Sequence, residues 1–292
     1  MIHIPVLLNE VIKYFNPKPN QNFIDGTLGN GGHALKILSL TKPQGKLLGL
    51  DLSKQVINEL TERKAKDPKI KDRLILVCDN FIHLKKIVQK LHFQPIDGIL
   101  LDLGLSSDLL ENSGQGFSFM RDERLDMRYN SEFTDLTAEK IINQYSKEEL
   151  TQIFKEFSQE RFSRRIANQI VSNRKKQKII TTDQLRNIIQ NALGRYFHIK
   201  SLARIFQSLR IEVNNELENL QQVLLSSIDL LSPGGRMIVI SYHSLEDRIV
   251  KRFFKQESRL KILTKKPISP SHSEIVENRR SRSAKLRAAI KL

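Results

Sequence analysis

The chain has 292 residues, 39% of them hydrophobic, which is enough to bury a full core as one large domain or two smaller ones. Its single cysteine excludes a disulfide framework and a cysteine-based zinc site, and the absence of a leader pattern or an apolar run of membrane-spanning length predicts a cytoplasmic protein. The net charge of +16 indicates a polyanionic partner, although a solvated lysine-rich surface would give the same excess.

The first hundred residues alternate between short apolar runs and amphipathic segments. They predict strands at about 21–25, 46–51, 73–78 and 97–102 and helices near 33–41, 53–66 and 82–91. This alternation is typical of a parallel sheet with helices on both faces, whose ligand binds beyond the carboxyl ends of the strands. An acid stands at each of these ends: Asp25, Asp51, Asp79 and Asp102. Each one alone could equally be a helix cap.

The turn after the first strand carries the sequence DGTLGNGGH, from Asp25 to His33. A glycine-rich turn between a strand and a helix, with an acid such as Asp51 about 20 residues further on, is typical of an adenosine site. The carboxylate of Asp25 would repel a pyrophosphate but suits a cation, and S-adenosylmethionine carries an ammonium and a sulfonium. The turn therefore favours this cofactor over a nicotinamide dinucleotide, while a tight turn without a ligand is the remaining interpretation.

The pattern changes after Asp102. Residues 103–209 predict loops and amphipathic helices, at about 137–144, 147–157, 160–174 and 182–193, and a longer helix follows from about 209 to 231 before a strand at 236–241. We interpret residues 106–205 as an inserted helical domain that recognises the substrate. Residues 1–105 and 206–292 then form one discontinuous α/β domain.

The basic segment 279–287 alternates arginines with serines, and both residue types donate hydrogen bonds to phosphate oxygens. Because it contains few apolar residues, we expect it to be loose until it meets a polyanion. A solubilising tail is the alternative interpretation.

Seven segments together, spread over nearly the whole chain, resemble the bacterial 16S ribosomal RNA cytosine-N4 methyltransferases. They are residues 25–33, 102–107, 116–119, 125–128, 206–211, 242–248 and 280–287. The resemblance implies a class I methyltransferase fold, a Rossmann-like α/β sheet with an inserted helical domain. It also implies transfer of a methyl group from S-adenosyl-L-methionine to the N4 amine of cytidine 1402 in 16S rRNA of the small ribosomal subunit.

The resemblance also assigns site residues. The implied cofactor contacts are Gly31, Gly32, His33, Asp51, Phe81, Asp102 and Leu109, the last of which replaces a glutamine usual in the family and cannot donate a side-chain hydrogen bond. The implied RNA contacts are Arg128, Arg204, Arg210, Arg248, Arg280, Arg282 and Lys285.

Methyl transfer to the N4 amine requires a group that orients this weakly nucleophilic amine and an acceptor for its proton. We assign the orienting role to Asp102 or Ser106 and name His243 as a candidate proton acceptor. No cluster of His, Cys and Asp has the spacing of metal ligands, so no metal site is predicted. Neither a membrane nor DNA is expected as a partner, and the oligomeric state is not predicted.

Three other interpretations stay open from the sequence. A nicotinamide-dependent dehydrogenase would share the sheet, a non-catalytic RNA-binding assembly protein would share the fold without turnover, and a DNA methyltransferase would share the chemistry.

Overall fold

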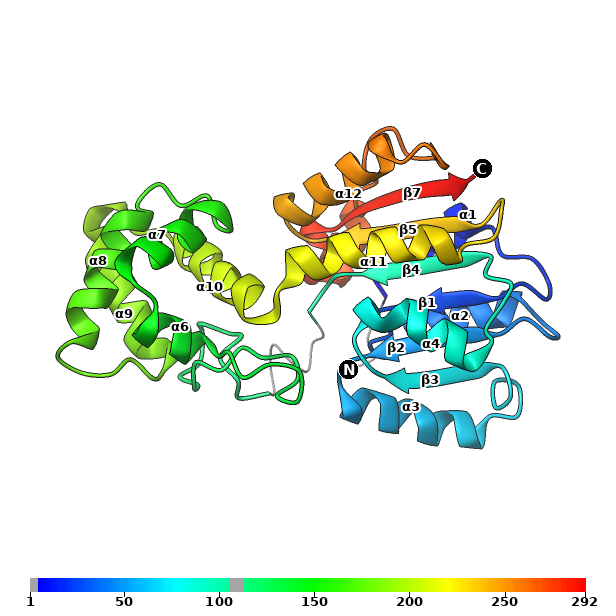
Figure 1. Cartoon of the computed structure of the whole chain (residues 1–292), viewed down its shortest axis with the longest axis horizontal. Helices are drawn as coiled ribbons and strands as arrows, with labels where there is room; N and C mark the ends of the chain where they lie inside the picture. The colour runs from blue at the N-terminus through cyan, green and yellow to red at the C-terminus, as the bar shows by residue number, and fades with distance from the viewer. Residues whose placement is uncertain (1–4, 106–112) are drawn as a thin grey trace. The chain divides into compact units, whose positions relative to one another are not determined.

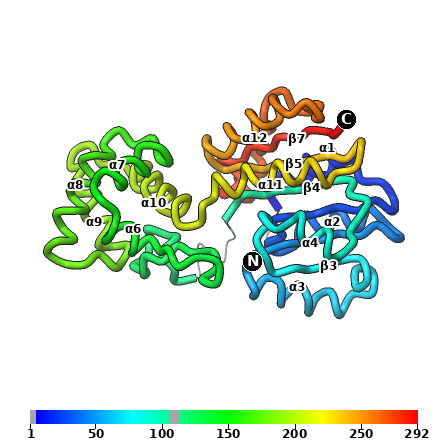
Figure 2. The backbone as a smooth tube through the Cα atoms, viewed as in Figure 1, coloured from blue at the N-terminus to red at the C-terminus, as the bar shows by residue number. Residues whose placement is uncertain are grey.

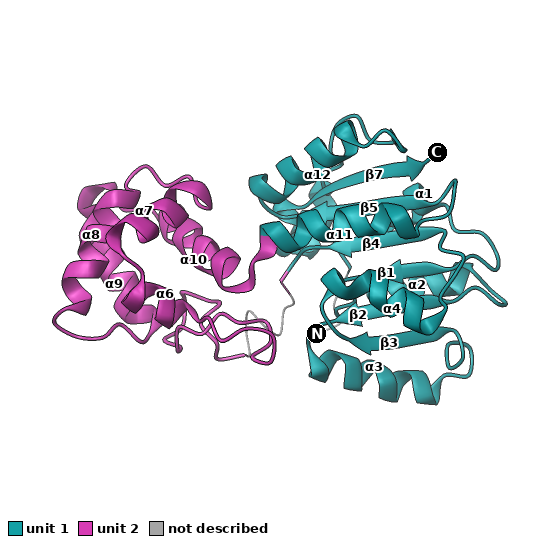
Figure 3. Ribbon diagram, in the orientation of Figure 1, with its two compact units in different colours: residues 1–104, 217–292 teal, residues 105–216 magenta. Residues whose placement is uncertain are grey.

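The computed structural model describes residues 5–105 and 113–292, and these divide into two compact units. One unit comprises residues 1–104 and 217–292, and the other comprises residues 105–216 (Figure 3). The predicted second boundary near residue 206 falls inside a helix, Ile199–Asn214, that belongs to the helical unit. Within the described ranges there is no helix that combines the length and apolar character needed to cross a membrane.

The first unit is built on a sheet whose seven described strands lie in the order β3-β2-β1-β4-β5-β7-β6 (Figure 1). The strands are β1 (Phe23–Asp25), β2 (Leu47–Asp51), β3 (Leu74–Cys78), β4 (Gly98–Asp102), β5 (Arg236–Ser241), β6 (Leu260–Ile262) and β7 (Lys285–Lys291). Strands β1 to β5 pair in parallel, whereas β7 pairs antiparallel with both β5 and β6. The α/β fold and its four early strands are thus confirmed.

Helices pack against both faces of this sheet, as Figures 1 and 2 show along the chain. They are α1 (Leu8–Phe15), α2 (Gly32–Leu40), α3 (Lys54–Lys66), α4 (Leu84–Leu91), α11 (Glu216–Leu230), α12 (Ser244–Gln256) and α13 (His272–Glu277), with the short helices η1 (Phe81–His83) and η3 (Arg279–Ser283). Successive strand residues enter different cores, because side chains alternate across a strand. Ile24 and Ile99 pack with α4, α11 and α12, while Phe23 and Leu100 pack with α1, α2 and α3.

The second unit is helical and has its own apolar core, which includes Phe154, Ile166 and Leu185. Its elements are α6 (Ala138–Gln144), α7 (Lys147–Glu156), α8 (Ser163–Arg174), α9 (Thr182–Leu193), η2 (Gly194–Tyr196) and α10 (Ile199–Asn214). The starts of α7 and α9 were predictable because each has a capping box, in which Ser146 or Thr181 bonds the backbone three residues ahead.

The predicted single helix over 209–231 is wrong. The chain forms α10 and α11 instead, and they are separated at Asn215, which has a φ of +50° and caps α10 in the left-handed conformation. Asparagine tolerates this conformation better than most residues, so it can end a helix without a glycine.

The prediction of a loose basic segment at 279–287 is also wrong. Residues 279–283 form η3, and β7 begins at Lys285 and lies between β5 and β6. Leu286 and Ala288 are fully buried, and Arg287, which is 7% exposed, is paired with Asp247 of α12. The apolar residues of this segment supply enough burial to order it despite its charge.

Candidate active site

Three acids lie at the same edge of the sheet, at the carboxyl ends of neighbouring strands. Asp25 ends β1, Asp51 ends β2 and Asp102 ends β4. The order of the strands reverses between β1 and β4, and open α/β sheets bind their ligands in the crevice at such a point. Asp25 and Asp102 therefore flank the position at which a ligand is expected.

Asp51 joins the glycine turn to the start of α3 through its two carboxylate oxygens. Oδ2 accepts a hydrogen bond from the Gly29 amide at 2.9 Å, and Oδ1 accepts one from the Ser53 amide at 2.8 Å. Burial raises the pKa of Asp51, and these backbone donors partly oppose that effect. Each oxygen has a second lone pair, so the carboxylate can also accept ribose hydroxyls.

The turn needs glycine at two positions with left-handed backbone, Gly29 at φ +48° and Gly31 at φ +75°. Gly31 is the N-cap of α2 and supplies no side chain to bond the first amides of that helix. The next glycine, Gly32, packs against the N-terminal segment, where a Cβ would come within 2.2 Å of Pro5 Cγ. The start of α2 therefore presents backbone donors in a close-packed setting.

Asp25 is the most perturbed carboxyl of the site. It is 1% exposed, and burial raises its pKa to about 7, against the lowering effects of His33 and of a hydrogen bond from the Thr27 amide at 3.2 Å. The negative charges of Asp102 and Asp51 raise it further. Three acids therefore lie around one turn, and a bound cation would favour the ionised form of the Asp25 carboxyl group.

Asp102 is held by three contacts from different parts of the first unit. Its backbone amide donates to Thr27 Oγ1 at 2.6 Å, and the hydroxyl of Tyr242 donates to its Oδ1 at 2.9 Å. Its other carboxylate oxygen lies 3.7 Å from His33 Nε2. Burial, followed by the charge of Asp102, raises the pKa of Tyr242 well above its usual value, so this hydroxyl stays a donor.

His33 is buried, and neither of its ring nitrogens has a hydrogen-bond partner among the described residues. A buried polar side chain without a partner costs free energy unless a ligand satisfies it. Together with the carboxylates of Asp25 and Asp102, this histidine offers hydrogen bonding and negative charge to one ligand. A methyl donor with an ammonium and a sulfonium fits that set.

The other predicted cofactor residues lie in different settings. Phe81 lies in η1, and its Cβ is 3.7 Å from the place where a Cβ on Gly26 would stand, so it lies beside the turn. Ser106 and Leu109 lie outside the described residues.

His243 is the N-cap of α12. Its Nδ1 accepts a hydrogen bond from the Glu246 amide at 3.4 Å, and its Nε2 lies 3.1 Å from the Glu246 carboxylate. An acceptor at Nδ1 leaves the proton of a neutral ring on Nε2, which lies near the Glu246 carboxylate but has no hydrogen-bond partner among the described residues. This geometry favours a capping role for His243 over proton acceptance.

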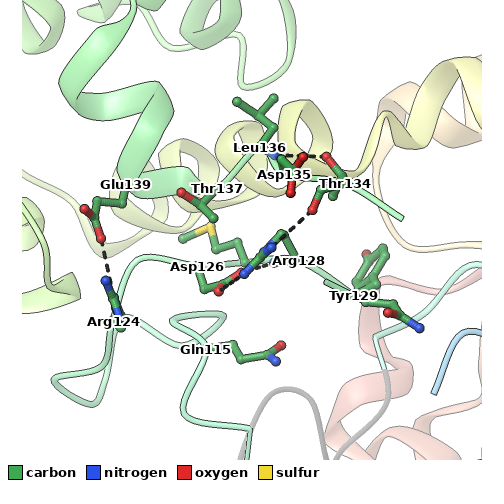
Figure 4. Close-up of polar contacts among 12 residues, drawn as sticks. Gln115, Arg124, Asp126, Arg128, Tyr129, Thr134, Asp135, Leu136, Thr137 and Glu139 are labelled. Carbon is green, nitrogen blue, oxygen red and sulfur yellow. Dashed lines mark hydrogen bonds and ion pairs between the residues drawn. The ribbon is translucent and has the colours of Figure 1, made fainter. Parts of the chain in front are cut away.

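Three of the predicted RNA contacts are ion-paired inside the helical unit. Arg128 forms two hydrogen bonds with Asp126, at 2.7 and 2.8 Å, and points toward it in Figure 4. Arg210 forms two with Glu216, at 2.8 and 2.9 Å, and Arg204 pairs with the buried Glu160. Each guanidinium therefore has a structural role, and the predicted contact with RNA stays a prediction.

The remaining predicted RNA contacts belong to the first unit. Arg248 on α12 and Arg282 in η3 are exposed, and Arg280 is half-buried. Lys285 lies 3.7 Å from Asp247.

Sequence reasoning gave no role to Tyr242 or Thr27, the two side chains that hold Asp102. A signal for Thr27 exists, since it stands where the cofactor turn usually has its first glycine and so has a hydroxyl to use. No local pattern links Tyr242 to an acid 140 residues earlier.

The fold and this site define an S-adenosylmethionine-dependent methyltransferase of class I. The fold is shared with a crystal structure named as a putative rRNA methylase from Clostridium thermocellum, which has a TM-score of 0.51, 14% sequence identity and full coverage of both chains. Over residues 1–292 the sequence matches the MraW methylase family, and the chain belongs to that family.

Relatives named Ribosomal RNA small subunit methyltransferase H are similar along almost their whole length. One from Thermotoga neapolitana is 44% identical over 98% of this chain and 95% of its own. Another from Carboxydothermus hydrogenoformans is 42% identical over 99% of this chain and 98% of its own. The nicotinamide dehydrogenase interpretation is therefore set aside.

Proposed function

We propose that this protein transfers the methyl group of S-adenosylmethionine to the N4 amine of cytidine 1402 in 16S rRNA of the small ribosomal subunit, in the cytoplasm. The observation that carries the proposal is identity above 40% with small-subunit rRNA methyltransferases over nearly the whole chain. The charge of +16 agrees with an RNA substrate.

The cofactor site is assigned to Asp51, the glycine turn, Asp25 and His33. Asp51 accepts from the ribose, the turn amides contact the polar end of the cofactor, and the charge of Asp25 complements a cation. When bound, the cofactor supplies an electrophilic methyl group on a sulfonium.

Asp102 is the residue we assign to the target amine. The N4 lone pair is delocalised into the cytosine ring, so the amine has to be oriented toward the methyl group and has to lose a proton as the new bond forms. Tyr242 and Thr27 fix the position of Asp102, and a fixed carboxylate can accept a hydrogen bond from the amine. The target base has to leave any stack before it reaches this carboxylate.

Two substitutions at Asp102 separate orientation from proton acceptance. Asp102→Asn keeps an acceptor for Tyr242 and for the amine but has no basic oxygen, whereas Asp102→Ala loses both. If Asp102 accepts the proton, both variants lose a similar factor in kcat, on the order of a hundred-fold. If it only orients the amine, the asparagine variant keeps most of the rate. Full methylation by the alanine variant at saturating cofactor would contradict both roles.

The proposed function is tested by the transfer of labelled methyl groups from S-adenosylmethionine to small subunits purified from a strain that lacks this protein. Mass spectrometry of the nucleosides then identifies the modified base, and duplex DNA serves as the parallel substrate. Label in N4-methylcytidine supports the proposal. Label in DNA alone, or none with protein that binds the cofactor, contradicts it and would favour the DNA enzyme or the non-catalytic assembly protein.

A further inference from the structure

Two groups of arginines in the helical unit differ in their partners. Arg128, Arg204 and Arg210 are paired with carboxylates, as described above. A second group is exposed, and none of its members has a carboxylate within 4.0 Å in the described part of the chain. This group consists of Arg161, Arg164, Arg165 and Arg195. Within this group, Arg195 Nη2 donates a hydrogen bond to the Tyr196 hydroxyl at 2.9 Å.

Two of these arginines lie over aromatic rings that stack on each other. The rings of Phe162 and Tyr196 have centroids 5.3 Å apart and planes 27° from parallel. The guanidinium of Arg161 lies 5.7 Å from the centroid of Phe162, and that of Arg195 lies 5.0 Å from the centroid of Tyr196. We call these four residues the aromatic-arginine platform.

A buried contact fixes the platform on its scaffold. Glu160, only 3% exposed, accepts hydrogen bonds from the Phe162 amide at 3.1 Å and from Arg204 of α10. Phe162 is the N-cap of α8, and Tyr196 ends η2 just before α10. The ion pair between Glu160 and Arg204 therefore joins the segment that carries Phe162 to the helix that follows Tyr196. A surface held in this way loses little conformational entropy when it binds a ligand.

The platform is open to solvent on its tyrosine side. Tyr196 is 44% exposed, and the neighbouring Ile199 and Lys200 are exposed as well. The largely exposed residues 194–200 include Arg195 and Lys200 and no Asp or Glu, so this stretch of the surface is basic. A stack that served only to join α8 to η2 would gain most by burying its rings and would need no guanidinium groups without a carboxylate partner beside it.

We propose that the aromatic-arginine platform binds unpaired bases of single-stranded RNA, with Tyr196 and Arg195 stacking on the bases and the arginine charges contacting the phosphates. The identification of the ligand as RNA rests on the proposed function. Single-stranded RNA exposes flat bases and phosphates together, and proteins bind these with aromatic rings and arginine planes in a basic setting. Double-stranded RNA hides its base faces and offers nothing for Tyr196 to stack on.

The first test compares two substitutions of equally exposed aromatics in the helical unit. Tyr196→Ala removes the stacking surface, and Phe133→Ala is the control, because Phe133 is 45% exposed but lies between Glu132 and Asp135 rather than among arginines. In methylation of small subunits we expect Tyr196→Ala to raise KM about ten-fold, from the loss of one stacked base. Its kcat and its calorimetric affinity for S-adenosylmethionine should match those of the control.

The second test uses the absence of tryptophan from this chain. Tyr196→Trp introduces the only tryptophan of the chain into the platform, and stacking of a base should quench its emission. We expect quenching by a single-stranded oligoribonucleotide and little by a duplex of the same length. Adding Arg195→Gln should lower the slope of log affinity against log salt by about 0.7, the value for one phosphate contact on a single strand.

The two tests separate failure of the platform from failure of the proposed function. If the wild-type protein methylates small subunits and Tyr196→Ala behaves like Phe133→Ala, the platform proposal is wrong while the proposed function stands. If single-stranded RNA quenches the tryptophan but no methyl reaches rRNA, the platform stands and the proposed function is wrong. Equal quenching by single-stranded and duplex RNA also overturns the platform proposal, because it shows contact through charge alone.

Discussion

The buried carboxyl of Asp25 should make the stability of the protein depend on pH. Its pKa is raised by burial from an ordinary 3.8 to about 7. Between these two pH values the folded chain holds the proton and the unfolded chain does not. The stability that this group contributes is therefore fully present below pH 3.8 and is lost as the pH rises through 7.

Replacement of Asp25 by asparagine removes this dependence while keeping an acceptor for the Thr27 amide. A carboxyl that titrates differently in the two states changes the free energy of unfolding by about 1.4 kcal/mol per pH unit, so the interval from 3.8 to about 7 corresponds to about 4 kcal/mol. Relative to Asp25→Asn, the wild-type protein should become less stable by up to about that amount between about pH 4 and about pH 8.

The assay is urea unfolding of both proteins at a series of pH values without cofactor, followed by circular dichroism. Taking the difference between the proteins cancels the groups that they share. Saturating S-adenosylmethionine should flatten the dependence, because a bound cation favours the ionised form of Asp25. A stability difference that stays constant across this pH range would refute the reasoning about its burial.

Three further substitutions test one close contact and two ion pairs. Gly104→Ala would place a Cβ within 2.8 Å of the Tyr242 ring, so we expect a lower kcat for methylation. Circular dichroism should show that the variant still folds. An unchanged kcat would show that the ring can move freely. Asp247→Asn leaves the buried Arg287 without its carboxylate partner and should cost about 3 kcal/mol in urea unfolding. Asp229→Asn, in a surface pair, should cost less than about 1 kcal/mol, and equal costs would contradict the assigned burial.

The sheet edge could be predicted from the sequence because its signals are local. Alternating strands and helices place the last residue of each strand at one edge, so the order of elements along the chain is enough to group Asp25, Asp51 and Asp102. The glycine turn could be found for the same reason, since its conformations limit the residues that fit.

The internal ion pairs and the place of β7 depend on contacts between residues far apart in the sequence. Arg204 and Glu160 are 44 residues apart and Arg287 and Asp247 are 40 apart, and no periodicity links them. Basic residues that the fold pairs internally therefore have the same pattern in the sequence as RNA contacts. The place of β7 could not be predicted for a similar reason, because its arginine and two lysines conceal an apolar run that becomes a strand only beside β5.

The insertion of the helical unit between β4 and β5 has a consequence for folding kinetics. These adjacent strands pair in parallel although the whole helical unit lies between them in the sequence. Closing a loop costs more entropy as it grows longer and more disordered. The helical unit has its own core and many contacts between successive helices, a local pattern that folds fast. We therefore expect the helices to form first during refolding, and the speed at which the sheet closes to depend on residues that form no part of it.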